Sequence, residues 1–196
     1  GYDAEDTLFA TEFSKRNYRN FEAGINLYNG KKNKMDIDYW AGGKFYNYSN
    51  NFNTRESNLG LDLGVTKWFA NKHEATVQIT NSLLGYKDII NENLNNLNIK
   101  PSFTFHGNVF KLKVGANLVS SLEGFSFFPD AEASVNLAGP AIMVFAGAGG
   151  DMYQNSFKRL TTENPFLSLH GGSPFNTKYF DYYGGVAGGF RNVSYR

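Results

Sequence analysis

The chain of 196 residues contains no cysteine. This absence excludes disulfide frameworks, thiolate metal sites and cysteine nucleophiles. A run of 18 or more apolar residues is also missing, which excludes a transmembrane helix. The chain opens on the polar stretch GYDAEDT, so we expect no signal peptide in it.

An excess of charge of one sign is missing as well. The formal net charge is +1, and lysines and arginines are scattered rather than clustered. The chain therefore shows no basic cluster of the kind that binds nucleic acid. We therefore expect no nucleic-acid partner.

Aromatic residues and glycines are abundant, with 18 Phe, 12 Tyr and 21 Gly against 5 Pro. This composition favours strands and tight turns over helices. The stretch FEAGINLYNGKKNKMDIDYWAGGKF, residues 21–45, alternates apolar and polar residues on both sides of an Asn-Gly dipeptide. It therefore predicts two strands joined by a hairpin turn.

The same alternation recurs along the chain and no sustained helical period accompanies it. It is present at 59–66, 74–80, 97–105, 110–118, 130–137 and 180–186. Short turns are predicted at Asn29–Asn33, Ala70–Lys72, Gly107–Asn108, Ala138–Pro140 and Arg191–Asn192. Longer polar links are predicted mostly between them, at Ser49–Ser57, Lys87–Asn96, Ser120–Gly124 and Gln154–Asn176. Short turns at one end and longer loops at the other are typical of transmembrane barrels.

The composition of the polar face separates a membrane barrel from a soluble one. A soluble barrel has its apolar face inside and needs a densely charged outer face. Here only 19% of the residues are charged, and the polar face is rich in Gly, Ser, Thr and Asn. In lipid every backbone group must pair within the protein, which a closed barrel achieves. We therefore predict an all-β, antiparallel up-and-down transmembrane β-barrel with about ten strands and a single domain spanning residues 1–196.

This prediction fixes the direction of individual side chains. The apolar side chains should be exposed on the outer wall, and the polar ones should point inside. The outward set is Leu61, Val77, Ile99, Leu112 and Val135, and the inward set is Asp62, Gln78, Lys100, Lys113 and Ser134.

Four stretches of the C-terminal half carry a family resemblance. They are FFPD at Phe127–Asp130, FAGAGG at Phe145–Gly150, the loop Asn155–Phe166 with NSF and NPF, and YFDYYGG at Tyr179–Gly185. In these stretches the chain resembles the outer-membrane β-barrel proteins of Bacteroidetes-type bacteria that are labelled TonB-dependent-receptor-like. The resemblance implies an architecture and a bacterial outer-membrane location rather than a chemistry. The sequence shows about ten strands and no plug domain, and RNVSYR at 191–196 looks like the first residues of another strand. We therefore expect either a barrel of about ten strands or a fragment of a larger barrel.

No motif for catalysis, cofactor or metal binding is found. AGAGGD at 146–151 lacks the G-x-G-x-x-G spacing of dinucleotide sites and is better explained by small residues where strands bend. His73, His106 and His170 are too far apart for a local metal motif. No G-x-S-x-G occurs. We expect no cofactor and no enzymatic activity.

Charged residues on the polar face are the candidate functional residues. They are Glu22, Asp36, Asp38, Asp62, Glu74, Lys100, Lys111, Lys113, Asp130, Glu132 and Asp181. They form either a charged pore wall that selects solutes or a salt-bridged interior that fills a narrow barrel, and the second interpretation is favoured for about ten strands. Parity places Lys113 against Asp130 and Lys111 against Glu132 across one hairpin.

The predicted function is passage or transport of solutes across the bacterial outer membrane, in the manner of a porin-like barrel. The alternative is a structural or adhesive barrel subunit of a cell-envelope assembly that acts through its extracellular loops, with other outer-membrane proteins as partners beside the outer-membrane lipid. A soluble ligand-binding barrel is the third hypothesis. The link Gln154–Asn176 suits either folding inward as a constriction or docking on a partner.

Overall fold

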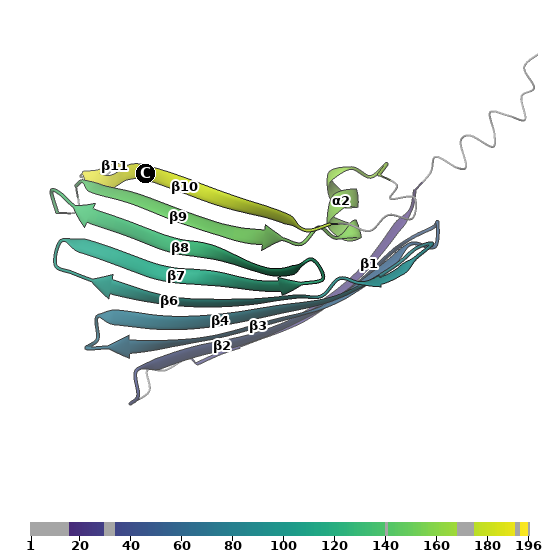
Figure 1. Ribbon diagram of the computed structural model, residues 1–196, viewed down its shortest axis with the longest axis horizontal. Coiled ribbons are helices and arrows are strands. Elements are labelled where there is room, and N and C mark those ends of the chain that lie inside the picture. Colours follow the sequence, from purple (N-terminus) through teal and green to yellow (C-terminus); the bar gives the residue numbers. More distant parts are fainter. Residues whose placement is uncertain (1–15, 30–33, 140, 168–174, 191–192, 196) are drawn as a thin grey trace, which may run out of the picture.

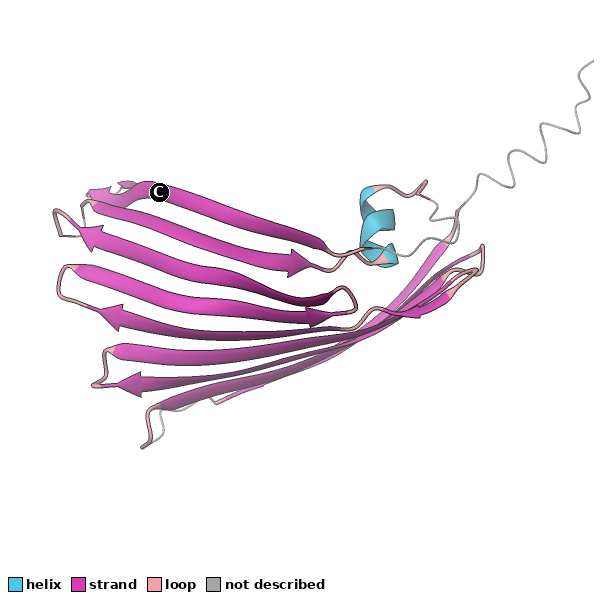
Figure 2. Ribbon diagram, in the orientation of Figure 1, coloured by secondary structure: helices cyan, strands magenta, loops and turns pink. Residues whose placement is uncertain are grey.

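Each alternating stretch of the sequence forms a β-strand in the computed structural model, which describes residues 16–29, 34–139, 141–167, 175–190 and 193–195. The strands are β1 (Tyr18–Tyr28), β2 (Ile37–Asn50), β3 (Arg55–Phe69), β4 (His73–Lys87), β5 (Asn91–Asn93), β6 (Asn96–His106), β7 (Phe110–Ser121), β8 (Gly124–Asn136), β9 (Met143–Tyr153), β10 (Thr177–Phe190) and β11 (Val193–Tyr195). One helix, α2 (Phe157–Glu163), lies between β9 and β10 in the chain (Figure 2).

The strands form one sheet in which chain neighbours are also neighbours in space. The order is β1-β2-β3-β4-β6-β7-β8-β9-β10-β11, every pairing is antiparallel, and the short β5 pairs with β4 beside this path. The prediction of an all-β up-and-down sheet of about ten strands is therefore confirmed. Among the described residues no pairing joins β1 to β11, so the sheet is a curved trough rather than a closed barrel (Figure 1).

The predicted connections are only partly correct. The short turn at Ala70–Lys72 is confirmed, because Phe69 pairs with His73 across it. The longer link predicted at Ser120–Gly124 is wrong, since Ser121 pairs with Gly124 and leaves a two-residue turn. The predicted turns at 29–33, 138–140 and 191–192 fall wholly or partly outside the described residues.

Apolar side chains cover the outer face of the sheet. On β3, Leu59, Leu61, Leu63 and Val65 are between 40% and 48% exposed, while Thr66 on the opposite face is 7% exposed. The predicted outward set behaves in the same way, with Leu61, Val77, Leu112 and Val135 exposed and Ile99 partly exposed. The predicted inward set is partly or fully buried. The facing prediction is confirmed for these residues.

The buried side chains lie on the inner, concave face in two clusters. The first, which we call the α2 cluster, contains Tyr46, Tyr48, Leu84, Tyr86 and Phe157. The second contains Val119, Phe128 and Met152. Within the described ranges no helix is long and apolar enough to span a membrane.

Candidate functional site

The interior of the trough holds ion pairs that join different strands, one between neighbours and one across two intervening strands. Lys113 on β7 contacts Asp130 on β8, with 2.6 Å between Nζ and Oδ2. Lys100 on β6 contacts Asp151 on β9, with 2.7 Å between Nζ and Oδ2. The second carboxylate oxygen of Asp151 accepts a hydrogen bond from Asn117 at 2.6 Å. Asp151 was missed in the sequence because the Gly-rich stretch before it obscures the alternation.

The predicted contact between Lys113 and Asp130 is present, but the predicted register is wrong. Lys113 lies directly opposite Glu132, Asp130 lies opposite Gly115, and Lys111 lies opposite Ser134. The two-residue turn moves the hairpin centre by one residue, which shifts every partner by two positions and preserves the face. Lys113 therefore reaches Asp130 diagonally, which its long side chain allows.

The acidic residues of the early strands are also satisfied by neighbours. Asp38 accepts from the indole Nε1 of Trp68 at 2.8 Å and from Asn29 at 3.2 Å. Asp62 accepts from Gln78 at 3.0 Å. The donors are neutral side chains, so these hydrogen bonds hold the two carboxylates in place without compensating their charge.

Glu22 and Glu132, which lie on the two walls of the trough, also have side-chain partners. Glu22 on β1 pairs with Lys44 at 3.4 Å and with Lys158 of α2. Glu132 on β8 accepts from the hydroxyl of Tyr183 at 2.9 Å. Glu22, Lys100, Lys113 and Asp130 are therefore the predicted lumen charges that form ion pairs among the described residues.

The remaining predicted lumen residues lie apart from these pairs. Asp36 precedes β2 in a turn with a φ of 51°, outside the strand to which the sequence assigned it. Glu74 is partly buried opposite Trp68 and Thr104. Lys111 is exposed near the β6–β7 turn, and Asp181 is exposed opposite Gly149. The eleven charges are thus spread along the strands rather than gathered at one site.

Helix α2 lies at the end of the trough that carries the longest link (Figure 1). Figure 1 shows it at one end of the trough, between the β9–β10 wall and β1. Phe157 is 2% exposed, and its ring contacts those of Tyr48 and Tyr86, with centroids 5.9 Å and 6.0 Å away. The hydroxyl of Thr161 lies 3.0 Å from that of Tyr48. The link Gln154–Asn176 therefore folds inward at its described start.

A buried carboxylate from a distant strand holds the start of α2. Glu56 on β3 is 1% exposed and accepts hydrogen bonds from the backbone N–H groups of Phe157 at 2.5 Å and Lys158 at 3.2 Å. The hydroxyl of Tyr46 donates to the same carboxylate at 2.8 Å. These donors are the free N–H groups of a helix start, where a negative charge is favourable.

Lys158 connects α2 to strand β1. Its ammonium lies 4.5 Å from the centre of the Tyr46 ring and pairs with Glu22. Partial burial lowers the pKa of the Lys158 amine from its ordinary value, and the neighbouring Glu22 carboxylate favours the charged form. Because Glu22 belongs to β1 and Glu56 to β3, the helix ties two strands of one wall to the link that follows β9.

Neither Glu56 nor α2 is predicted from the sequence, although weak signals for both are present in it. Extending the β3 alternation back from Asp62 through Gly60 and Asn58 places Glu56 on the inner face. Ser156 accepts from the Arg159 N–H at 3.2 Å as the N-cap of α2, a residue type typical of helix starts. A helix of seven residues is too short to give a periodic signal.

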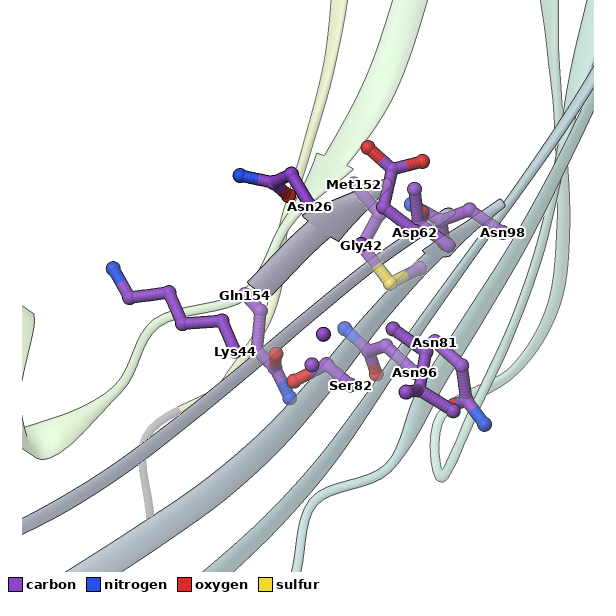
Figure 3. Close-up of a pocket in the computed structure, with 14 residues that line it drawn as sticks. Asn26, Gly42, Lys44, Asp62, Asn81, Ser82, Asn96, Asn98, Met152 and Gln154 are labelled. Atoms are coloured by element: carbon purple, nitrogen blue, oxygen red, sulfur yellow. The ribbon is translucent and has the colours of Figure 1, made fainter. Parts of the chain in front are cut away.

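A cavity of about 320 Å³ lies on the inner face beside the α2 cluster (Figure 3). Lys44 is the next inward residue after Tyr46 along β2, and Ser82 is the one before Leu84 along β4, so the α2 cluster borders the cavity at one end. We call it the amide cavity because Asn and Gln contribute much of its lining. Its inward side chains and glycines are Asn26, Gly42, Lys44, Gly60, Asp62, Thr80, Ser82, Asn96, Asn98, Met152 and Gln154.

The residues that line the amide cavity come from strands near both edges of the sheet. Asn26 comes from β1, near one edge, and Met152 comes from β9, near the other. One small cavity touches both, so the two walls face each other closely at this level.

The histidines and carboxylates in the described part of the chain do not cluster around a metal site. No group of three His, Asp or Glu residues there is placed to hold a metal ion. His73 accepts a hydrogen bond from the His106 N–H at 3.1 Å and stacks on Phe105 at 4.4 Å. His170 lies outside the described residues.

Comparisons of the chain with models of protein families, with curated proteins and with solved structures find no match. The resemblance to outer-membrane barrels of Bacteroidetes-type bacteria stays a prediction from the sequence.

Proposed function

We propose that this protein is a β-barrel of the bacterial outer membrane through which solutes pass. The observation that carries the proposal is the outer face, where apolar side chains are exposed along consecutive strands. Leu61 on β3, Val77 on β4, Phe103 on β6 and Leu112 on β7 are all at least 40% exposed. An apolar surface that continues across strands marks contact with lipid or with another protein.

The inner face supports a polar lumen. Asn, Thr, Ser and paired charges occupy it, and side chains on alternate faces of a strand meet different surroundings. This distribution is typical of barrels with lipid outside and a polar interior.

The strand number supports closure of the trough. The path from β1 to β11 holds ten strands with antiparallel steps throughout, so β1 and β11 run in opposite directions. Pairing of their free edges would therefore be antiparallel, as in bacterial barrels with an even number of strands. A closed barrel would leave no unpaired edge in the membrane.

Conductance of the purified full chain in a planar lipid bilayer tests the proposal. We expect discrete current steps, because a lumen lined by polar side chains conducts ions when water fills it. The control is the same detergent without protein. Stable insertion without current, measured over a range of voltages, would contradict the passage of solutes.

A second function, a barrel subunit that binds other envelope proteins through its loops, is favoured by one observation. Phe166 is 77% exposed, Phe175 is 74% exposed and Ile89 is 80% exposed, all in links at the α2 end. Exposed aromatic side chains are common at the centres of protein interfaces. Insertion without current would favour this second function.

A further inference from the structure

Three basic side chains lie in one row on the outer face of the sheet, at the end that carries α2. Arg19 on β1 lies opposite Ser49 on β2, which lies opposite Arg55 on β3. Arg55 in turn lies opposite Lys87 on β4. We call these four residues the basic row. They belong to the outer face because Glu56, next to Arg55 in the chain, points to the inner face, and all three basic side chains are exposed.

The cations of the basic row have no counter-charge in the described part of the chain. Arg19, Arg55 and Lys87 form no ion pair and donate no hydrogen bond there. The next row on the same face is uncharged and consists of Phe21, Asn47, Ser57 and Gly85. Like charges directly opposite each other on neighbouring strands destabilise a sheet, so the pair of Arg55 and Lys87 is unfavourable without an anion beside it.

Two depressions in the surface give a ligand access to these cations. The first, of about 360 Å³, is lined by Arg19 and Arg55 together with asparagines, and no described carboxylate borders it. The second, also of about 360 Å³, adjoins the first at Arg55 and is lined by Lys87 as well. The carboxylates that border the second, Glu56 and Glu92, belong to the inner face. Two guanidinium groups beside one depression are suited to a phosphate group, which they bind by paired hydrogen bonds.

The basic row lies where the apolar part of the outer face begins. Phe45, Leu59 and Leu83 form a row of their own on neighbouring strands and are 40–42% exposed. Phe21 contacts this apolar row, with its ring centroid 6.5 Å from that of Phe45. Arg19 precedes Phe21 by two residues, or about 7 Å along the strand. The headgroup layer of a bilayer is about 5–8 Å thick on each side, so the row lies at the depth of lipid phosphates when the apolar face contacts acyl chains.

We propose that the basic row binds the phosphate groups of membrane lipids at the α2 end of the protein. A phosphate lies in the first depression between Arg19 and Arg55, and Lys87 supplies a further cation beside Arg55. The place of the row beside the apolar face favours a lipid over a free anion, because acyl chains then cover the exposed apolar side chains. The inference rests on the lipid-facing outer surface of the proposed function and not on the passage of solutes.

Native mass spectrometry of the full chain, released from a neutral detergent, tests the inference. The probes are phosphatidic acid and phosphatidylcholine with the same acyl chains, and inorganic phosphate is added as a competitor. We expect phosphatidic acid to bind at least about tenfold more tightly than phosphatidylcholine, whose choline cation offsets the phosphate charge. Arg19→Gln and Arg55→Gln should each weaken its binding about fivefold, because each basic side chain adds attraction to an anionic headgroup. An equal concentration of inorganic phosphate should not displace it.

Lys67→Gln is the matched control for net charge. Lys67 lies on the outer face of the same strand as Arg55, at the end with the short turns, and its ammonium donates to the Met35 carbonyl oxygen. This variant should bind phosphatidic acid as the natural chain does. Thermal unfolding in neutral detergent is the control for folding. Arg55→Gln should not lower the unfolding temperature there, since it removes one of two like charges that lie opposite each other.

Equal affinity for the two lipids, unchanged binding of phosphatidic acid in both arginine variants or its displacement by inorganic phosphate would overturn the inference. An equal loss of binding in Lys67→Gln and Arg55→Gln would also overturn it, because net charge would then account for the attraction. Selective lipid binding without current in the bilayer experiment would support the basic row and contradict the passage of solutes. Current steps without selective lipid binding would do the opposite, and absence of both would overturn both.

Discussion

Gly150 lies directly against the ring of Phe128, one of the most buried side chains of the protein. A Cβ atom at Gly150 would come within 2.9 Å of that ring and 2.8 Å of the Tyr179 carbonyl oxygen, so Gly150→Ala must displace a strand or the ring. We expect a loss of about 1–3 kcal/mol in the free energy of unfolding, as for other overpacked sites. Urea denaturation of the purified chain measures it. Gly149→Ala, next in the chain, should have a much smaller effect because nothing lies within 4 Å of its Cβ position.

The ion pair between Lys113 and Asp130 is a second prediction at the scale of residues. Lys113→Glu removes the ammonium that lies 2.6 Å from Asp130 and places a carboxylate directly opposite Glu132. We expect the folded form to lose heat resistance on a gel, and Asp130→Lys added to it to restore part of that resistance. Because both side chains are about one third exposed, solvent screens the pair and the change should be modest. Additive losses in the double variant would show that the two groups do not interact.

At the scale of elements, β4 tests which face meets lipid. Val77 is 44% exposed on the outer face, while the neighbouring Gln78 points inward and donates to Asp62. In a lipid bilayer, Val77→Lys should cost about 2–4 kcal/mol near the midplane. Gln78→Lys is the control, because its ammonium would face the Asp62 carboxylate. Folding equilibria in lipid vesicles compare the two variants, and equal stability of both would contradict lipid contact at Val77.

The first two backbone N–H groups of helix α2 are bound by one distant carboxylate, Glu56 on β3. In Glu56→Gln the amide NH₂ cannot accept from the helix N–H groups, so one of the bonds from Phe157 and Lys158 is lost. We expect amide exchange at Phe157 and Lys158 to speed up about tenfold or more, since a buried hydrogen bond to a charged group is lost. Hydrogen exchange followed by mass spectrometry measures this. Glu163→Gln, at the exposed end of α2, should leave exchange unchanged.

Most of the strands could be predicted from the sequence, whereas β5, β9 and α2 could not. Alternation over ten or more residues, as in β3 and β7, repeats the same signal many times. Turn length sets register but changes composition little, so the β7–β8 register was predicted two positions from the observed one. Glu56 and Asp151 acquire their roles from partners 101 and 51 residues away in the chain, which no local pattern encodes.

At the scale of the whole molecule, the edges of the sheet decide whether a barrel forms. In an edge strand every second backbone N–H group points away from its only partner and exchanges with solvent. If β1 pairs with β11 in the membrane, the backbone N–H groups on the free edge of β1 that lie opposite the three residues of β11 should be protected as strongly as those of β3. Residue-resolved hydrogen exchange in lipid nanodiscs measures this, with β3 as the internal reference because it has partners on both sides. Rapid exchange at alternate β1 residues would show that the edge stays open.

The contact between Glu56 and Phe157 has a consequence for the order of events during folding. The two residues are separated by 101 positions, and all of β4 to β9 lies between them. Contacts between such distant residues form slowly, because the loop they close must be ordered first. The carboxylate has no helix to hold until the sheet has curved enough to bring β9 near β3. Docking of α2 is therefore expected among the last steps of folding. It requires that the sheet has already reached its final curvature.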